Sequence, residues 1–163
     1  MFKARTITGA GKADMYREIA QQLEGLLAGE SDAIANAANT SALLFQSLPD
    51  LNWAGFYFLR AGGELVLGPF QGKPACVRIA AGRGVCGAAV VRRQSVRVAD
   101  VNEFPGHIAC DADSRAELVV PLMRQGIIVG VLDLDSPHVG RFDAEDQAGI
   151  EHVAAIYVAA CEF

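Results

Sequence analysis

Two apolar runs in the second half of the chain constrain the fold more than any other feature. Residues Glu117 to Met123 and Ile127 to Leu134 are rich in β-branched and other apolar side chains. They meet around Gln125 and Gly126, and a short connection that contains glycine is typical of a β-hairpin. We therefore predict that the two runs form adjacent strands in the middle of a sheet.

Acidic side chains flank this hairpin. Glu117 begins the first run, whereas Asp133 and Asp135 end the second. A hairpin would bring these carboxylates together, and an unpaired carboxylate beside an apolar strand is costly to bury. Cys110 lies just before the first run, in the stretch GHIACDADSRAELVVPL. Cys110 is therefore the candidate chemical centre, with the three acids close to it.

The composition narrows the class of protein. At 163 residues, with 52% hydrophobic and 20% charged residues, the chain is expected to form one globular domain over residues 1–163. A formal net charge of -5 and scattered basic residues argue against nucleic-acid binding. The sequence contains neither a signal-peptide core nor an apolar stretch long enough to span a membrane. We expect a cytoplasmic protein without a membrane partner.

Residue periodicity and capping signals predict the remaining elements, with helices in residues 1–48 and the sheet, the active-site loops and a C-terminal helix in residues 51–160. The first half is predicted to contain a helix over Lys12–Ala28 started by Asp14, a helix from Ser31 or Asp32 to Leu48, and strands over Asn52–Leu59, Glu64–Phe70 and Cys76–Ile79. A short helix after Gly84 and a strand over Ser95–Ala99 follow. The second half is predicted to contain a loop over Asp100–Asp113, the hairpin, and a helix from Asp143 to Ala160. This order predicts an α+β fold with a central, mostly antiparallel sheet of five or six strands flanked by helices. The leading helices could supply the surface of a homodimer.

The four cysteines are the main functional clue. In a reducing compartment they are buried thiols, metal ligands or redox catalysts rather than structural disulfides. Cys86 and Cys161 fit buried helical positions, whereas Cys76 and Cys110 lie in or beside polar loops. A zinc site made of Cys76, Cys86, His107 and Cys110 would lack the short cysteine spacing of structural zinc, so no metal is expected.

The acids near Cys110 limit its chemistry. Carboxylates raise the pKa of a nearby thiol, which argues against an ordinary thiolate hydrolase. A clustered carboxyl group with a raised pKa can instead remain protonated and polarise an electrophile. Asp111 and Asp113 fit a solvated turn, and His107 fits a hydrogen-bonded loop residue.

Taken together, several motifs resemble those of the free methionine (R)-sulfoxide reductases, which are stand-alone GAF domains. The resemblance is carried by NWAGFYF, LVLGPFQGKPACVRI, GRGVCGAAV, DVNEFPGHIACD, ELVVPL, GVLDLDSP and FDAEDQ, roughly from Leu51 to Gln147. It implies a GAF-like domain that reduces free methionine (R)-sulfoxide to methionine, with no bound cofactor and with thioredoxin as the external reductant.

The resemblance also implies roles for three cysteines. Cys110 would be the nucleophile, Cys76 the resolving cysteine, and Cys86 a third cysteine that helps recycling. Attack on the sulfoxide would leave a sulfenic acid on Cys110, which condenses with a nearby thiol to a disulfide. Thiol–disulfide exchange would then reopen this bond. Whether Cys76 or Cys86 reaches Cys110 first stays open.

The remaining implied roles concern the substrate. Glu117, Asp133 and Asp135 match the acids that hold and polarise it, but Ala116 stands where related sequences usually carry serine, which puts a minor substrate hydrogen bond in doubt.

The residue types themselves suggest two further contacts. Trp53 or Tyr57 could enclose the S-methyl group of the substrate, although both aromatic residues also fit an apolar core. Backbone N–H groups at the helix start from Gly84 to Cys86 could bind the carboxylate of the substrate. The alternative function is a GAF module that senses a small ligand without chemistry.

Overall fold

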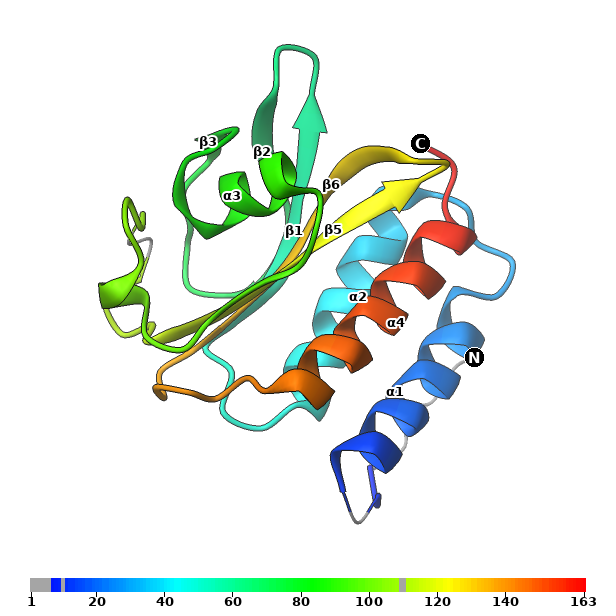
Figure 1. Cartoon of the computed structure of the whole chain (residues 1–163). Helices are drawn as coiled ribbons and strands as arrows, with labels where there is room; N and C mark the ends of the chain where they lie inside the picture. The colour runs from blue at the N-terminus through cyan, green and yellow to red at the C-terminus, as the bar shows by residue number, and fades with distance from the viewer. Residues whose placement is uncertain (1–6, 10, 109–110) are drawn as a thin grey trace.

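A six-stranded antiparallel sheet forms the centre of the protein (Figure 1). The computed structural model describes residues 7–9, 11–108 and 111–163. The strands lie in the order β3-β2-β1-β6-β5-β4. In chain order the elements are α1 (Lys12–Leu27), α2 (Ala33–Ser47), β1 (Trp53–Arg60), β2 (Glu64–Gly72), β3 (Arg78–Ala80), α3 (Gly84–Arg92), β4 (Val96–Val98), the 3-10 helix η1 (Val101–Glu103), β5 (Ala116–Arg124), β6 (Ile127–Ser136) and α4 (Ala144–Ala160). The predicted α+β fold with five or six strands is confirmed.

The hairpin expected from the two apolar runs is formed by β5 and β6. Arg124 pairs with Ile127, so that only Gln125 and Gly126 remain in the turn. Both turn residues have positive φ, 49° and 79°, which matches the two-residue turns that suit the twist of a hairpin. Because β6 also pairs with β1, the hairpin lies in the middle of the sheet.

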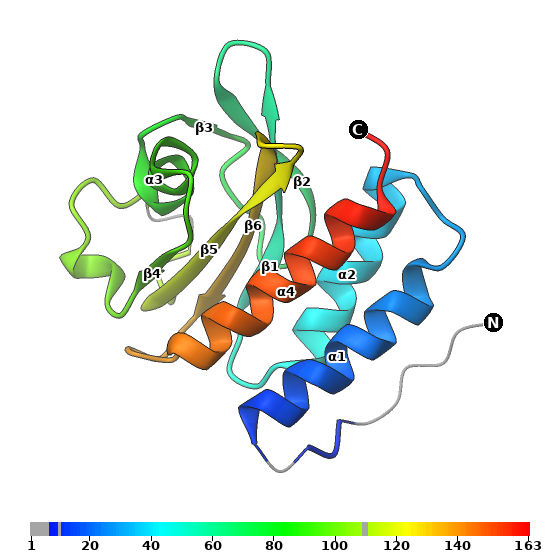
Figure 2. The same ribbon diagram turned by 45° about the vertical axis from the view of Figure 1, so that its right-hand side comes forward.

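Helices α2 and α4 cover one face of the sheet, and α1 packs on the outside of α4 and α2 (Figures 1 and 2). Alternate strand residues, such as Phe56, Leu118 and Leu132, point to these helices and are fully buried. In α2, Asp32 accepts a hydrogen bond from the backbone N–H of Ala35, as its capping role predicts. This face is a dry apolar core.

One predicted helix cap and one predicted strand start were wrong. Helix α1 begins at Lys12, as predicted, but Asp14 lies in its first turn instead of capping it. The N-cap residue is Gly11, whose backbone is extended. Strand β3 begins at Arg78 because its ladder with β2 starts where Arg78 meets Val66. Cys76 therefore lies in the connection before β3.

One acid is fully buried among the helices. Asp146 of α4 is 0% exposed and receives hydrogen bonds from Lys12 Nζ at 2.5 Å, Tyr16 OH at 2.9 Å and Arg141 at 3.1 Å. Its carboxylate also accepts the backbone N–H of Asp143, completing the capping box that begins α4. The Asp146 cluster thus joins α1 to the start of α4.

The opposite face of the sheet is covered by α3 and by the loops around it (Figure 2). Side chains alternate between faces along a strand, so this face receives Trp53, Tyr57, Val119 and Val131. None of the helices in the described ranges combines the length and apolar character that crossing a membrane requires.

Candidate active site

The strand register places three acids on the face covered by α3. Trp53 of β1 pairs with Asp135 of β6, which in turn pairs with Glu117 of β5. Asp133 lies two residues before Asp135 and therefore points to the same face, opposite Gly55 of β1. The predicted convergence of Glu117, Asp133 and Asp135 follows from this pairing.

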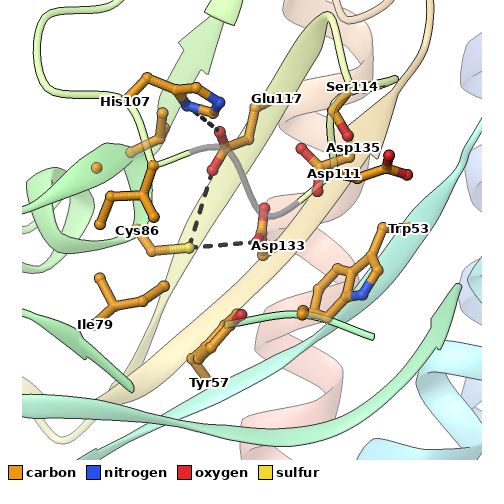
Figure 3. A pocket seen from close by; sticks show the side chains of 14 residues that line it. Trp53, Tyr57, Ile79, Cys86, His107, Asp111, Ser114, Glu117, Asp133 and Asp135 are labelled. Carbon is orange, nitrogen blue, oxygen red and sulfur yellow. Dashed lines mark hydrogen bonds and ion pairs between the residues drawn. The ribbon is translucent and has the colours of Figure 1, made fainter. Parts of the chain in front are cut away.

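The three acids border a small cavity under α3 (Figure 3). The other lining residues include Trp53, Tyr57, Ile79, Cys86, His107, Ile108, Asp111 and Ser114. Its volume is about 40 Å³, which holds a few water molecules at most. Binding of anything larger requires side chains at the rim to shift.

Cys86 contacts two of the acids from the first turn of α3. Its Sγ donates a hydrogen bond to Asp133 Oδ2 at 3.3 Å and lies 4.0 Å from Glu117 Oε1 (Figure 3). Cys86 is 3% exposed, and Glu117 and Asp133 are each 6% exposed. The three polar groups are therefore packed against one another away from water.

Burial and mutual repulsion keep protons on these groups. Burial raises the pKa of Glu117 well above its usual range, and the negative charges of Asp133 and Asp135 add to the effect. Burial likewise raises the pKa of Asp133 to about 7, although the Cys86 hydrogen bond acts against it. The pKa of Asp135 is raised by burial and then by Asp133. Burial also raises the pKa of Cys86, which stays a thiol at neutral pH.

The cavity contains polar atoms that the protein itself leaves unsatisfied. Within the described part of the chain, Asp133 Oδ1 and His107 Nδ1 are buried without a hydrogen-bond partner. Native proteins pair most buried polar atoms, and an exception calls for a functional or chemical reason. An acceptor such as Asp133 Oδ1 would be satisfied by a cationic or N–H group of a bound molecule.

Trp53 and Tyr57 form the aromatic wall of the cavity. Their rings stack with centroids 5.9 Å apart, and Trp53 also stacks on Phe70 at 5.3 Å. Gly55 makes this possible, because a Cβ there would meet Phe70 Cβ at 2.3 Å and the Trp53 ring at 2.6 Å. Both aromatic residues are cavity walls as well as parts of the apolar cluster on this face.

The same two aromatics hold the connection between β2 and β3. Trp53 Nε1 donates to the carbonyl of Lys73 at 3.2 Å, and Tyr57 OH donates to the carbonyl of Cys76 at 2.9 Å. The Lys73 ammonium also bonds Asp111 Oδ1 at 3.1 Å and Asp113 Oδ2 at 2.5 Å. Two loops far apart in the sequence are thereby joined at the cavity rim.

Sequence reasoning missed three cavity residues. Asp111 does form a local turn, since its Oδ1 accepts the backbone N–H of Asp113, yet its carboxylate also lines the cavity. Ser114 is buried beside it and accepts a hydrogen bond from Asn52. His107 faces Glu117, with its Nδ1 3.6 Å from Glu117 Oε2. These residues reach the cavity because of the course that the loop between η1 and β5 takes. No periodic pattern or spacing of residues in the sequence predicts that course.

Ala116 is turned away from the cavity. It is 0% exposed within the apolar core beneath α2 and α4, whereas the adjacent Glu117 points to the other face. A serine side chain at this position would point into the helix-side core. The expected loss of a minor substrate hydrogen bond at Ala116 is therefore unfounded, because neighbouring strand residues face opposite sides.

The proposed nucleophile, Cys110, lies outside the described residues. Cys76 lies in the connection before β3 and is disulfide-bonded, whereas the described free thiols are those of Cys86 and Cys161. Cys161 is buried at the end of α4, where Asn36 Nδ2 donates to its sulfur at 3.5 Å. The roles assigned to Cys110, Cys76 and Cys86 stay predictions.

The nearest approach to a metal-ligand cluster differs from the zinc site considered above. Among the described residues, Cys86, Glu117 and Asp133 place one ligand atom each within 4.8 Å of one another. These atoms already share a hydrogen bond, and the raised pKa values of the two carboxyls keep protons on them. We interpret the trio as a proton-holding cluster.

The start of α3 offers donors to an anion. Gly84 begins this helix with φ of 61°, and no side chain caps the terminus. Gly84, Val85 and Cys86 all line the cavity. The first N–H groups of a helix have no intrahelical partner and attract negative charge, so acids and N–H donors border one cavity.

Comparisons with known proteins agree with this architecture. A GAF domain family model matches residues 35–162. The free methionine-R-sulfoxide reductase of Escherichia coli is 54% identical over 88% of this chain and 87% of its own. The structure of a free methionine-R-sulfoxide reductase from Neisseria meningitidis in complex with its substrate superposes with a TM-score of 0.94 at 43% identity, covering 98% of this chain and 95% of that one. A GAF sensor protein structure from Burkholderia vietnamiensis has a TM-score of 0.89 at 56% identity over 93% and 96% of the two chains.

Proposed function

Because this chain belongs to the free methionine-R-sulfoxide reductases, a family of GAF domains, we propose that it reduces free methionine (R)-sulfoxide to methionine in the cavity under α3. One observation carries the proposal. Three acids with raised pKa values, Glu117, Asp133 and Asp135, face one small cavity that also contains an aromatic wall. A site of this kind suits a substrate with an ammonium group and a basic, polar oxygen.

The acids supply the chemistry that a sulfoxide requires. Its sulfur becomes electrophilic when its oxygen receives a proton or a strong hydrogen bond. Glu117 is the proton donor in this proposal, because it is buried and retains its proton at neutral pH. Asp133 and Asp135 bind the ammonium group, whose positive charge favours their ionised forms and whose N–H satisfies the unpartnered Oδ1 of Asp133. The carboxylate of the substrate binds the N–H groups at the start of α3.

The redox step uses Cys110 and Cys76. The Cys110 thiol releases its proton to solvent and its sulfur attacks the sulfoxide sulfur. The S–O bond of the sulfoxide breaks, and the oxygen passes to Cys110 with the proton from Glu117. The methionine sulfur gains two electrons and the cysteine sulfur loses two, which gives methionine and a sulfenic acid. The Cys76 thiol then displaces water from the sulfenic acid and forms a disulfide. Thioredoxin, a dithiol protein, reduces this bond in the reducing cytoplasm and completes the cycle without a bound cofactor.

The surroundings of the other cysteines support Cys76 rather than Cys86 as the resolving residue. Cys76 is disulfide-bonded and lies in a connection at the cavity rim, and its carbonyl is fixed by Tyr57. Cys86 is 3% exposed and donates its hydrogen bond to Asp133. A large external reductant has better access to a rim connection than to a buried helix residue.

A ligand sensor is the second candidate, favoured by the 56% identity with the GAF sensor protein structure. Thiol counting separates the two functions. The fully reduced protein is mixed with methionine (R)-sulfoxide without thioredoxin, and free thiols are titrated before and after. The reductase loses two thiols per methionine formed, whereas a sensor loses none.

The activity itself is tested by NADPH consumption with thioredoxin and thioredoxin reductase. We expect turnover with the free (R)-sulfoxide and much less with the (S)-sulfoxide or a peptide-bound (R)-sulfoxide. Full activity of Cys110→Ser would refute the nucleophile. Normal multiple turnover of a Cys76→Ser, Cys86→Ser double variant would refute intramolecular resolution.

A further inference from the structure

His107 lies between solvent and the buried carboxyl group of Glu117. Its Nδ1 is 3.6 Å from Glu117 Oε2, and its side chain is 16% exposed compared with 8% for that of Glu117. Figure 3 shows the imidazole beside one oxygen of this carboxyl group, while Cys86 contacts the other. An acid this deeply buried needs a route by which a donated proton can return.

The other neighbours of Glu117 do not offer that route. Cys86, 4.0 Å from its Oε1, is 3% exposed, and Asp133 is 6% exposed. Cys86 also already donates its hydrogen bond to Asp133. Asp135, opposite Glu117 on β6, is partly exposed, but no hydrogen bond or ion pair joins it to Glu117. Among the described residues, His107 is thus the partly exposed side chain that contacts the Glu117 carboxyl.

The imidazole has an unused nitrogen at the contact. Nδ1 of His107 is buried and has no hydrogen-bond partner among the described residues. Hydrogen bonds between nitrogen and oxygen span about 2.7–3.2 Å, so a shift of less than about 1 Å would join Nδ1 to Glu117. Catalytic contacts are commonly long without substrate and tighten when it binds.

The electrostatics of the pair favour delivery of a proton to Glu117. Burial lowers the pKa of His107 and raises that of Glu117. A proton taken up by the imidazole therefore passes readily to an ionised Glu117 carboxylate. The titratable groups that share the cavity with His107 are Glu117 on β5, Asp133 and Asp135 on β6, Cys86 on α3, Tyr57 on β1 and Asp111 on the loop before β5.

We propose that His107 is a positioning residue that returns a proton from solvent to Glu117 after each reduction. The inference rests on the proposed function. In each cycle the Cys110 thiol releases one proton to solvent, and the proton of Glu117 becomes the hydroxyl proton of the sulfenic acid. His107 takes one proton from solvent and passes it to Glu117. The methionine sulfur gains two electrons, the cysteine sulfur loses two, and the net proton change is zero.

Steady-state and first-turnover kinetics of His107→Ala test the relay. With saturating reductant we expect kcat to fall about a hundredfold and KM to fall with it, so that kcat/KM stays close to that of the wild type. The first turnover should remain close to the wild-type rate, because Glu117 starts protonated. A structural role for His107 would slow the first turnover as well, and that result would overturn the relay.

Chemical rescue separates proton transfer from space filling. Imidazole added to His107→Ala should restore most of the lost kcat, whereas pyrazole, which has a similar shape and is a far weaker base, should not. His107→Asn keeps a polar group near the Nδ1 position without titrating, so it should stay slow. The matched control is His138→Ala. His138 is exposed, lies 3.9 Å from Asp50 and does not line the cavity.

The outcomes distinguish the relay from the function on which it rests. Wild-type reductase activity that depends on Glu117 but not on His107 would overturn the relay alone. Equal rescue by imidazole and pyrazole would also overturn it. No reduction of the free (R)-sulfoxide by the wild-type protein would overturn the proposed function and the relay together.

Discussion

The two faces of the sheet bury acids in opposite ways. On the helix-covered face, Asp146 is surrounded by Lys12, Arg141 and the Tyr16 hydroxyl. On the cavity face, Glu117 and Asp133 are also almost fully buried, but no lysine or arginine of the described residues pairs with them. Equally buried acids therefore differ in whether a cationic side chain pairs with them.

The difference separates a structural acid from a functional one. Asp146 has cationic partners and several hydrogen bonds, which is how proteins accommodate a buried charge. Glu117 and Asp133 repel each other and have raised pKa values instead. Strongly perturbed groups that face a cavity are candidates for acid–base catalysis.

The largest effect is expected for Glu117→Gln. Glutamine matches the shape of glutamic acid but cannot donate an acidic proton, so the rate of sulfoxide reduction should fall about 10²- to 10⁴-fold. The measurement is methionine formation from the free (R)-sulfoxide. Glu24→Gln, at an exposed position of α1, serves as the control and should be unaffected. A loss smaller than about tenfold would remove Glu117 from the proton-donor role.

Asp146→Ala should have the largest effect on stability. It would leave Lys12 and Arg141 without their shared partner, and breaking a buried pair costs about 3–5 kcal/mol. Urea unfolding of the variant gives the free energy directly. Asp14→Ala, which removes an exposed pairing with Arg17, should stay within about 1 kcal/mol of the wild type. Similar values for the two variants would contradict the structural role of Asp146.

The pH dependence of stability should differ between the faces. Asp133 has a pKa of about 7 in the folded protein and about 3.9 when unfolded, so the native state binds its proton more tightly. That contribution is complete below about pH 4 and is lost as the pH rises to about 7. The free energy of unfolding should fall over this range by on the order of a few kcal/mol.

The opposite sign applies on the helix face. Hydrogen bonds from Lys12 and from the backbone lower the pKa of Asp143 to about 2, so its contribution is lost only as the pH falls from about 4 to 2. Urea unfolding across pH 4–8 should therefore show a smaller slope for Asp133→Asn and an unchanged slope for Asp143→Asn. An equal slope for wild type and Asp133→Asn would contradict the assignment.

The smallest predicted effect concerns the aromatic wall. In Gly55→Ala the new methyl group would meet Phe70 and the Trp53 ring, and such overpacking costs about 1–3 kcal/mol. Displacement of Trp53 should also raise KM for the sulfoxide more than it lowers kcat. Gly62→Ala is the control for an added methyl group at a glycine with open space around it, although its positive φ adds strain. An unchanged KM in Gly55→Ala would argue against Trp53 as a substrate contact.

The contrast between faces was only partly predictable from the sequence. The apolar runs predicted the β5–β6 hairpin, and the cost of burying unpaired carboxylates pointed to Glu117, Asp133 and Asp135. The same alternation that turns Glu117 to the cavity turns Ala116 to the core, which is a local property and could have been read from the sequence.

The loops were less predictable because their paths depend on tertiary contacts. His107 and Asp111 look like ordinary loop residues in the sequence, yet both line the cavity. Asp111 is held there by Lys73, a residue 38 positions away. No periodicity or capping motif in the sequence indicates such a pairing between loops. The place of His107 and Asp111 at the cavity therefore follows only from the three-dimensional structure.

The most direct test of the account is infrared difference spectroscopy of the carboxyl proton on Glu117. Spectra of the wild type and of Glu117→Gln are compared at neutral pH, before and after the free (R)-sulfoxide is added to reduced protein. We predict a protonated-carboxyl band in the wild type that the variant lacks and that changes when substrate binds. A wild-type spectrum in which Glu117 is fully ionised at neutral pH would contradict the claim that the cavity holds a proton for the sulfoxide.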